Sequence, residues 1–183
     1  MKRTSILLFL LFFRSAIAVQ AQAQAPKPDP EVKKLHVWVG HWTLEGEAKP
    51  GPLGHGGKFS GEHDCRMILA GFFLQDRWTE KGPAGQRQGL EMDGYDPVNK
   101  NFSSWIYMDD GTTFSGVLTI TGNTWTWAGK LVTAGGQAQY KGTLVLAPDL
   151  ASWTYKDEFS PDGKAWTPLR EGEFTKAKPA RKK

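Results

Sequence analysis

Two side chains that could bind a metal or form a nucleophile–base pair stand close together in this sequence. His63 and Cys65 are two residues apart in KFSGEHDCRMIL (58–69), where polar and apolar residues alternate, so both point to one face of a strand. A metal site needs three or four ligands, and nothing in the sequence marks the others. Parallel side chains without an orienting third group do not form a hydrolase pair. We therefore predict no metal and no catalytic residues.

Two charged residues stand on otherwise apolar strand faces near the C-terminus. In the two-residue period of a strand, Arg170 falls on the same face as Trp166 and Phe174. Asp157 likewise falls on the same face as Tyr155. A carboxylate in such surroundings needs a partner, which Arg170 on the neighbouring strand could supply. A structural ion pair is favoured over a catalytic acid, because no second acid is clearly on the inner face. For Arg170 a structural role is favoured over an anion clamp that holds the carboxylate of a ligand.

A run of short strands must position these side chains. A two-residue period and turn-forming residues between the periodic stretches predict strands over about 42–48, 58–69, 71–81, 86–95, 101–109, 112–121, 124–133, 138–147, 151–159 and 165–175. Before them lies a short helix, with Asp29 as its cap and one apolar face formed by Val32, Leu35 and Val39. Successive hairpins predict an all-β protein, a ten-stranded antiparallel up-and-down β-barrel with a short N-terminal plug helix, and a two-sheet sandwich is the alternative.

The junction between helix and first strand, VGHWTLEGEA (39–48), resembles the calycin superfamily of lipocalin, fatty-acid-binding and nitrobindin-like barrels. The resemblance implies that Gly40 lets the chain turn from plug to wall and that Trp42 packs at the closed base, under Arg170 or Lys176. The pieces LHVWVGHWTLEGEA, GEHDCRMILAGFFLQDRW, GLEMDGYDPVNKNFSSWIYMDDGTTFSG and FSPDGKAWTPLREGEFTK also resemble the bacterial exported domain-of-unknown-function family 1579. That family brings no activity with it, so the resemblance implies a calycin-like barrel over residues 31–176.

The number of aromatic residues predicts an interior that holds a small molecule. A ten-stranded barrel encloses more space than an eight-stranded one, and a barrel lined by tryptophan and tyrosine is a small-molecule site by default. We predict a small apolar or amphipathic ligand that enters opposite the helix, between the loops at 49–57, 82–85, 109–112 and 134–137. The candidate ligand-binding residues are Arg170, Trp125, Trp127, Tyr140, Trp153, Tyr155, Asp157 and His63.

Two alternatives stay open. One is a filled barrel that serves as a structural or interaction module without a ligand. The other is a haem-binding barrel, because nitrobindin-like proteins, which this chain resembles, hold iron through a histidine near their C-terminal strands. This sequence has no histidine after His63, which argues against haem in that position. We predict no cofactor.

The N-terminus has the pattern of a secretory signal. Lys2 and Arg3 precede the apolar run at 6–13, and SAIA (15–18) is a small-residue cleavage motif, so we predict a signal peptide over 1–18 and a periplasmic or secreted protein. The run is shorter than the ~20 residues of a membrane span. A linker rich in proline, glutamine and alanine follows over 19–30, and a basic disordered tail forms 177–183.

The net charge of +4 is carried by these two ends, so the body is not basic and nucleic-acid binding is not predicted. The single cysteine cannot form an internal disulfide, so the fold depends on its core alone. We expect a monomer or a weak homodimer.

Overall fold

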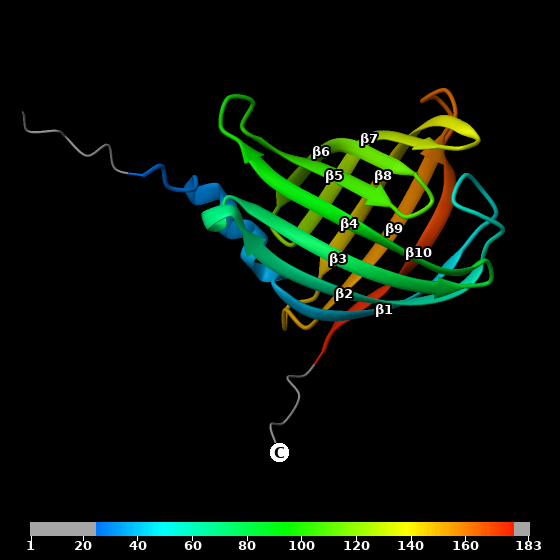
Figure 1. Ribbon diagram of the computed structural model, residues 1–183, viewed down its shortest axis with the longest axis horizontal. Helices are drawn as coiled ribbons and strands as arrows, with labels where there is room; N and C mark the ends of the chain where they lie inside the picture. Colours follow the sequence, from blue (N-terminus) through cyan, green and yellow to red (C-terminus); the bar gives the residue numbers. More distant parts are fainter. Residues whose placement is uncertain (1–24, 178–183) are drawn as a thin grey trace, which may run out of the picture.

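Ten strands form from the alternating stretches and close into a barrel (Figure 1). The computed structural model describes residues 25–177, so the predicted signal peptide, the first half of the linker and the tail from residue 178 lie outside the described residues. The strands are β1 (Gly40–Ala48), β2 (Gly57–Ile68), β3 (Phe73–Gly82), β4 (Gly85–Asp96), β5 (Asn101–Met108), β6 (Thr113–Thr121), β7 (Thr124–Thr133), β8 (Gly136–Leu146), β9 (Ser152–Ser160) and β10 (Thr167–Lys176).

Each strand pairs antiparallel with its neighbours in sequence, and β1 also pairs with β10. This last pairing leaves no open edge, which confirms the up-and-down barrel and excludes the sandwich. Turns on alternate hairpins therefore meet at the same end. The end opposite the helix, here called the rim, carries the four predicted loops and also the β9–β10 turn at 161–166, which the sequence analysis did not include.

The N-terminal helix is a 3₁₀ helix, η1 (Pro30–Trp38), and Asp29 caps it by accepting a hydrogen bond of 2.9 Å from the backbone N–H of Glu31. Its buried residues are Val32, Leu35 and Trp38, whereas Val39 is only half-buried. The predicted apolar face assumed 3.6 residues per turn. With three residues per turn, Trp38 takes the place expected for Val39. A second 3₁₀ turn, η2 (Leu69–Gly71), joins β2 to β3.

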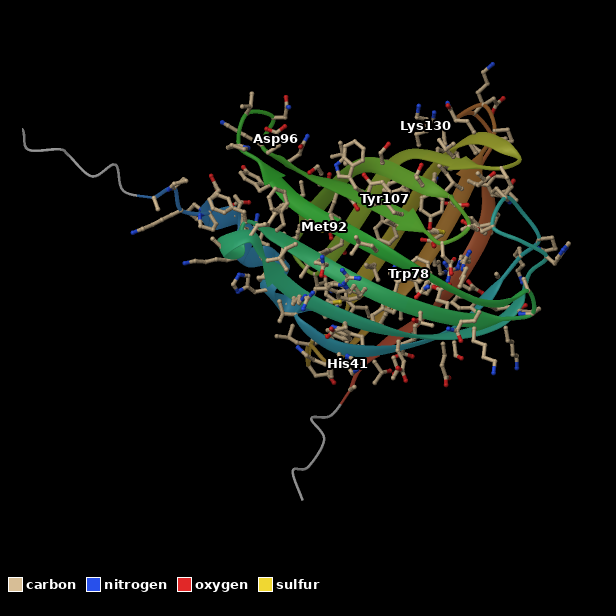
Figure 2. The ribbon with its side chains drawn as sticks, in the orientation of Figure 1. His41, Trp78, Met92, Asp96, Tyr107 and Lys130 are labelled. Atoms are coloured by element: carbon tan, nitrogen blue, oxygen red, sulfur yellow. The ribbon has the colours of Figure 1, made fainter. Side chains whose placement is uncertain are left out.

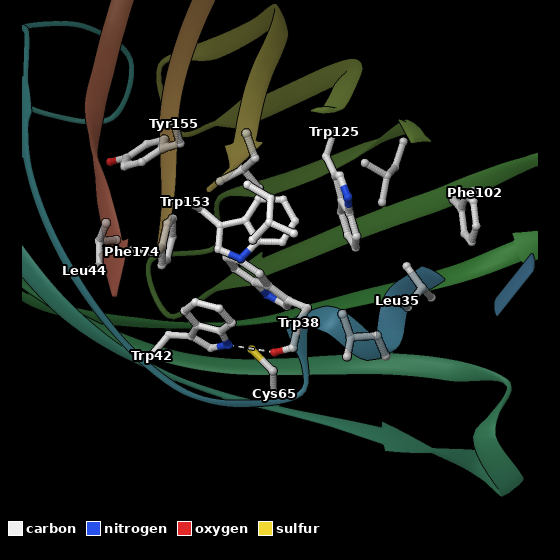
Figure 3. Close-up of a cluster of buried hydrophobic side chains, with 14 of the residues drawn as sticks. Leu35, Trp38, Trp42, Leu44, Cys65, Phe102, Trp125, Trp153, Tyr155 and Phe174 are labelled. Carbon is white, nitrogen blue, oxygen red and sulfur yellow. Dashed lines mark hydrogen bonds between the residues drawn. The ribbon is translucent and has the colours of Figure 1, made fainter. Parts of the chain in front are cut away.

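The base of the barrel is a cluster of tryptophans around η1 (Figure 3). Trp38 stacks on Trp42 with ring centroids 4.9 Å apart, and the indole N–H of Trp42 donates a hydrogen bond of 2.7 Å to the Trp38 carbonyl. Gly40, at a φ of +136°, makes the turn between them. Of the two basic residues considered for Trp42, it is Lys176 that lies over its ring, with Nζ 5.1 Å from the centroid.

The alternation of β10 is interrupted near its start. Its register against β9 shifts between Pro168 and Arg170, and Leu169 is buried as well as Phe174. A bulge of this kind changes which face the next residues point to. Trp166 precedes the bulge and lies under the ammonium group of Lys141, 4.2 Å from Nζ, so it does not share the inner face with Arg170 as the sequence pattern predicted.

Candidate functional site

The barrel encloses a cavity of about 100 Å³, lined by side chains from all ten strands, from Trp38 at the base and from Leu53 at the rim. This is smaller than the roughly 300–1,000 Å³ of sites for drug-sized ligands. The wall formed by β6, β7 and β8 is largely apolar and contains Phe114, Leu118, Trp125, Trp127, Leu131 and Leu144. The wall formed by β2, β3 and β4 carries ionisable groups, so the cavity has one apolar and one polar side.

The acids of the polar wall follow from strand alternation. In β3 the large apolar residues Leu74 and Trp78 point inward, and Asp76 and Glu80 have the same parity (Trp78 is labelled in Figure 2). In β4, Glu91 and Asp93 line the cavity in the same way. The expectation that no second acid faces inward is therefore wrong. The alternation of β3 was the signal that could have revealed two of these acids.

One polar group lies near the rim and is called here the rim ion cluster, consisting of Glu80, Arg87, Asp157 and Arg170. Arg170 Nη2 lies 2.6 Å from one oxygen of Glu80, and Arg87 Nη2 lies 2.9 Å from the other. Burial favours the neutral carboxyl, but the two guanidinium groups outweigh it and hold the pKa of Glu80 below its usual value. Burial, against the opposing effect of Arg170, raises the pKa of Asp157 to about 7.

The position of Arg170 bears on its two predicted roles. Its guanidinium carbon lies 4.2 Å from the centre of the Phe59 ring, and its charge is shared with Glu80 and Asp157. Glu80 is bonded to both arginines and offsets part of their charge without a ligand. This arrangement supports a structural role for Arg170, but its ion-pair partner is Glu80 rather than the predicted Asp157, which lies opposite Arg170 in the register.

A second polar group lies deeper and is called here the acid cluster, consisting of His63, Asp76, Glu91 and Asp93. His63 Nδ1 lies 2.7 Å from Asp76 Oδ2, and the hydroxyl of Ser104 donates to Glu91 at 3.1 Å. The register places Asp76 opposite Glu91, and Asp93 opposite Ser104.

The acid cluster contains three carboxyl groups and one imidazole, but no arginine or lysine. Burial, followed by the nearby carboxylates of Asp93 and Asp76, raises the pKa of Glu91 well above its usual value. Burial also raises the pKa of Asp93 to about 7. The acid cluster therefore differs from the rim ion cluster, because no guanidinium or ammonium group of the protein accompanies its carboxyl groups.

Several polar atoms that line the cavity have no hydrogen-bond partner within residues 25–177. They are His63 Nε2, Asp76 Oδ1 and Asp93 Oδ1 in the acid cluster, and Asp157 Oδ1 and Tyr155 OH closer to the rim. His63 is 6% exposed and Asp93 is 5% exposed, so bulk water does not solvate them. Buried polar atoms normally have a partner, so these atoms are expected to bond to ordered water or to a ligand in the cavity.

The structure brings most of the predicted ligand-binding residues together. His63, Trp125, Trp127, Tyr140, Tyr155, Asp157 and Arg170 all line the cavity. Trp153 instead lies in the base of the barrel. The centroid of its ring is 4.9 Å from that of Trp38 and 5.2 Å from that of Trp125. The sequence analysis missed the cavity residues Asp76, Glu80, Glu91, Asp93 and Ser104.

A haem group does not fit this interior. Of the four histidines, only His63 lines the cavity, whose volume of about 100 Å³ is far below that of a porphyrin. Among residues 25–177, no three side chains of histidine, cysteine, aspartate or glutamate are grouped so that they could hold a metal ion.

Within the same residues, no helix is both long enough and apolar enough to cross a membrane.

Comparisons with known proteins give a family for the chain and solved structures that are similar to it. A family model described as "Protein of unknown function (DUF1579)" matches residues 27–176. The crystal structure of Rv2717c from M. tuberculosis is similar to the chain with a TM-score of 0.60 at 12% identity, covering 83% of this chain and all of that one. A fluorescence-activating β-barrel designed de novo has a TM-score of 0.40 at 12% identity, covering 76% of this chain and 93% of its own. No curated protein matches the chain.

Proposed function

The chain belongs to the DUF1579 family of proteins of unknown function, and we propose that it is an exported protein that binds one small amphipathic molecule inside its barrel. The observation that supports this most strongly is the cavity with one apolar wall and one polar wall, in which buried polar atoms have no partner among the described residues. A ligand with an apolar body and a polar end matches both walls.

The composition of the interior also favours a ligand over a filled barrel. A barrel that serves only as a scaffold gains from apolar packing, whereas burial of carboxyl groups whose oxygens are only partly hydrogen-bonded costs free energy. The acid cluster carries that cost at the centre of the fold. Groups that decrease stability in this way are typical of binding sites rather than of structural cores.

The rim supplies a path to the cavity. The loop between β1 and β2 folds over this end, and its Leu53 lines both the cavity and a second hollow of about 70 Å³ beneath the loop. Glu80 and Arg170 also border both spaces. The loop contains Gly51, Gly54 and Gly56, which give it conformational freedom to move. The ligand is therefore expected to enter past Leu53, while η1 closes the base.

Export is part of the proposal and rests on the N-terminal sequence. The charged start, the short apolar run and the small residues at 15–18 together have the order of a cleaved signal, which would deliver the barrel to the periplasm or the medium. We propose no catalysis.

The proposal is tested by measuring ligand binding directly. Native mass spectrometry of the protein purified from its own compartment should show a co-purified mass, and short-chain amphiphiles should quench tryptophan fluorescence. Leu118→Trp, which fills the apolar wall, should weaken binding at least tenfold. Val117→Trp, on the outer face of the same strand, should leave it unchanged. If no amphiphile binds and no mass co-purifies, the filled-barrel module is the better description.

A further inference from the structure

We infer that the polar end of the ligand is a protonated primary amine, which the acid cluster holds through its unpartnered oxygen and nitrogen atoms. This inference rests on the proposed function and adds the chemical class of the ligand. Two features of the interior support it. The first is the distribution of charged side chains between the rim ion cluster and the acid cluster, and the second is the chemical type of the unpartnered atoms.

The first feature is an imbalance of charge along the barrel. In the rim ion cluster, Glu80 and Asp157 face Arg87 and Arg170, so acids and bases are equal in number. The acid cluster places three carboxyl groups around one imidazole. A cation is therefore favoured at the acid cluster and has no comparable place at the rim.

The second feature is that the unpartnered atoms of the acid cluster are acceptors. Asp76 Oδ1 and Asp93 Oδ1 are carboxyl oxygens, which accept hydrogen bonds when the groups are ionised, and a bound cation favours the ionised form. In the His63 tautomer whose Nδ1–H donates to Asp76, Nε2 carries a lone pair and is an acceptor. Three acceptors on adjacent strands call for a group with several donors. A primary ammonium group has three N–H donors and no acceptor, and it is compact enough for a cavity of about 100 Å³.

An acidic ligand fits the interior less well. A carboxylate or phosphate has no N–H donor for the unpartnered oxygens of Asp76 and Asp93, and its negative charge would oppose ionisation of the carboxyl groups around it. Arg170 offers no free charge to compensate, because its guanidinium is bonded to Glu80 at 2.6 Å. The apolar wall, with Trp125 and Trp127, would surround a short hydrocarbon or aromatic body attached to the amine.

The test compares head groups on one hydrocarbon chain. Binding of n-hexylamine, 1-hexanol, hexanoate and hexyltrimethylammonium is measured by calorimetry on the mature protein. We expect hexylamine to bind at least tenfold more tightly than hexanol, and hexanoate to bind most weakly. The trimethylated amine keeps the charge but has no N–H donors, so it should also bind at least tenfold more weakly than hexylamine.

A variant locates the site of the amine. Asp93→Asn should reduce the affinity for hexylamine at least tenfold and leave that for hexanol unchanged, whereas Asp64→Asn, on the exposed face of β2, should change neither. Thermal unfolding confirms that both variants are folded. Equal affinity of the parent for amine and alcohol, or tighter binding of hexanoate, would overturn the inference and leave the proposed function intact. Binding of none of the four probes would indicate that ordered water alone occupies the cavity.

Discussion

Asp93 and Asp157 are carboxyl groups that the folded protein holds close to neutrality, because burial raises the pKa of each to about 7. An aspartate in the unfolded chain titrates near ~3.9. Between these two values the folded protein keeps protons that the unfolded chain has lost. This contribution to stability is complete below about pH 4 and is lost as the pH rises through about 7. Glu80, with its lowered pKa, contributes in the opposite sense: its contribution is present above the ordinary pKa of 4.5 and is lost as the pH falls below that value.

We therefore expect the free energy of unfolding to fall between about pH 5 and pH 8, measured by urea denaturation at each pH. In Asp93→Asn one of the titrating groups is absent, so the fall should be smaller by roughly 2 kcal/mol. Asp64→Asn, which changes an exposed acid, should show the same fall as the parent. An unchanged pH dependence in Asp93→Asn would show that this carboxyl group is already ionised at pH 5.

Cys65 is a free thiol that is 2% exposed and lies between β1 and β3 on the inner face of β2. Burial, with Asp76 and Glu91 nearby, raises the pKa of its thiol, so almost no reactive thiolate forms at neutral pH. A thiol reagent should therefore label it only in denaturant. Complete labelling of the folded protein within minutes would mean that this face of β2 opens to solvent.

At the scale of elements, η1 is stabilised by packing against the barrel rather than by its own length. Trp42 is completely buried, stacks on Trp38 and donates to its carbonyl, so it joins β1 to the plug. Trp42→Ala should lower the free energy of unfolding by about 3–5 kcal/mol in urea denaturation. Thr43→Ala, on the outer face beside it, should cost less than about 0.5 kcal/mol. A loss below about 1 kcal/mol in Trp42→Ala would contradict this role for the plug.

If the barrel binds a ligand as proposed, we expect the β1–β2 loop to control access to the cavity. Leu53 lies between the cavity and the hollow beneath the loop, so its side chain obstructs the path from the rim. In stopped-flow quenching with hexylamine, Leu53→Ala should raise the association and dissociation rates severalfold, with a smaller change in affinity. Val98→Ala, in the exposed turn at the opposite end, is the matched control. Faster exchange in Val98→Ala instead would place the path at the base.

At the scale of the whole molecule, closure of the barrel must provide stability without a disulfide, because the chain has one cysteine. This matters if the protein is exported, as proposed. N-terminal sequencing of the protein recovered from the periplasm or medium should begin at Val19, directly after SAIA. Recovery of the chain with Met1 intact in the cytoplasmic fraction would contradict export.

The order and type of the elements could be predicted from the sequence alone, because each strand depends on a local two-residue period and each turn on its own residues. The ten strands lie within a few residues of their predicted bounds. The same local pattern placed His63 and Cys65 on the inner face of β2. Where local geometry departs from the ideal period, as in the 3₁₀ helix that buries Trp38 and the bulge before Arg170, the prediction was wrong in detail.

Which charged residues line the cavity could be determined only from the tertiary structure. In β3 polar residues point to both faces: Gln75 and Arg77 lie on the outer face, and Asp76 and Glu80 lie on the inner face. The hydrophobic pattern therefore identifies the inner face only through Leu74 and Trp78. Glu80 is held inside by Arg170, ninety residues later in the chain. A buried charge is tolerated only where another group compensates it, and in a closed barrel that group comes from strands distant in sequence. Local pattern therefore determined the wall, and only closure decided which charges meet within it.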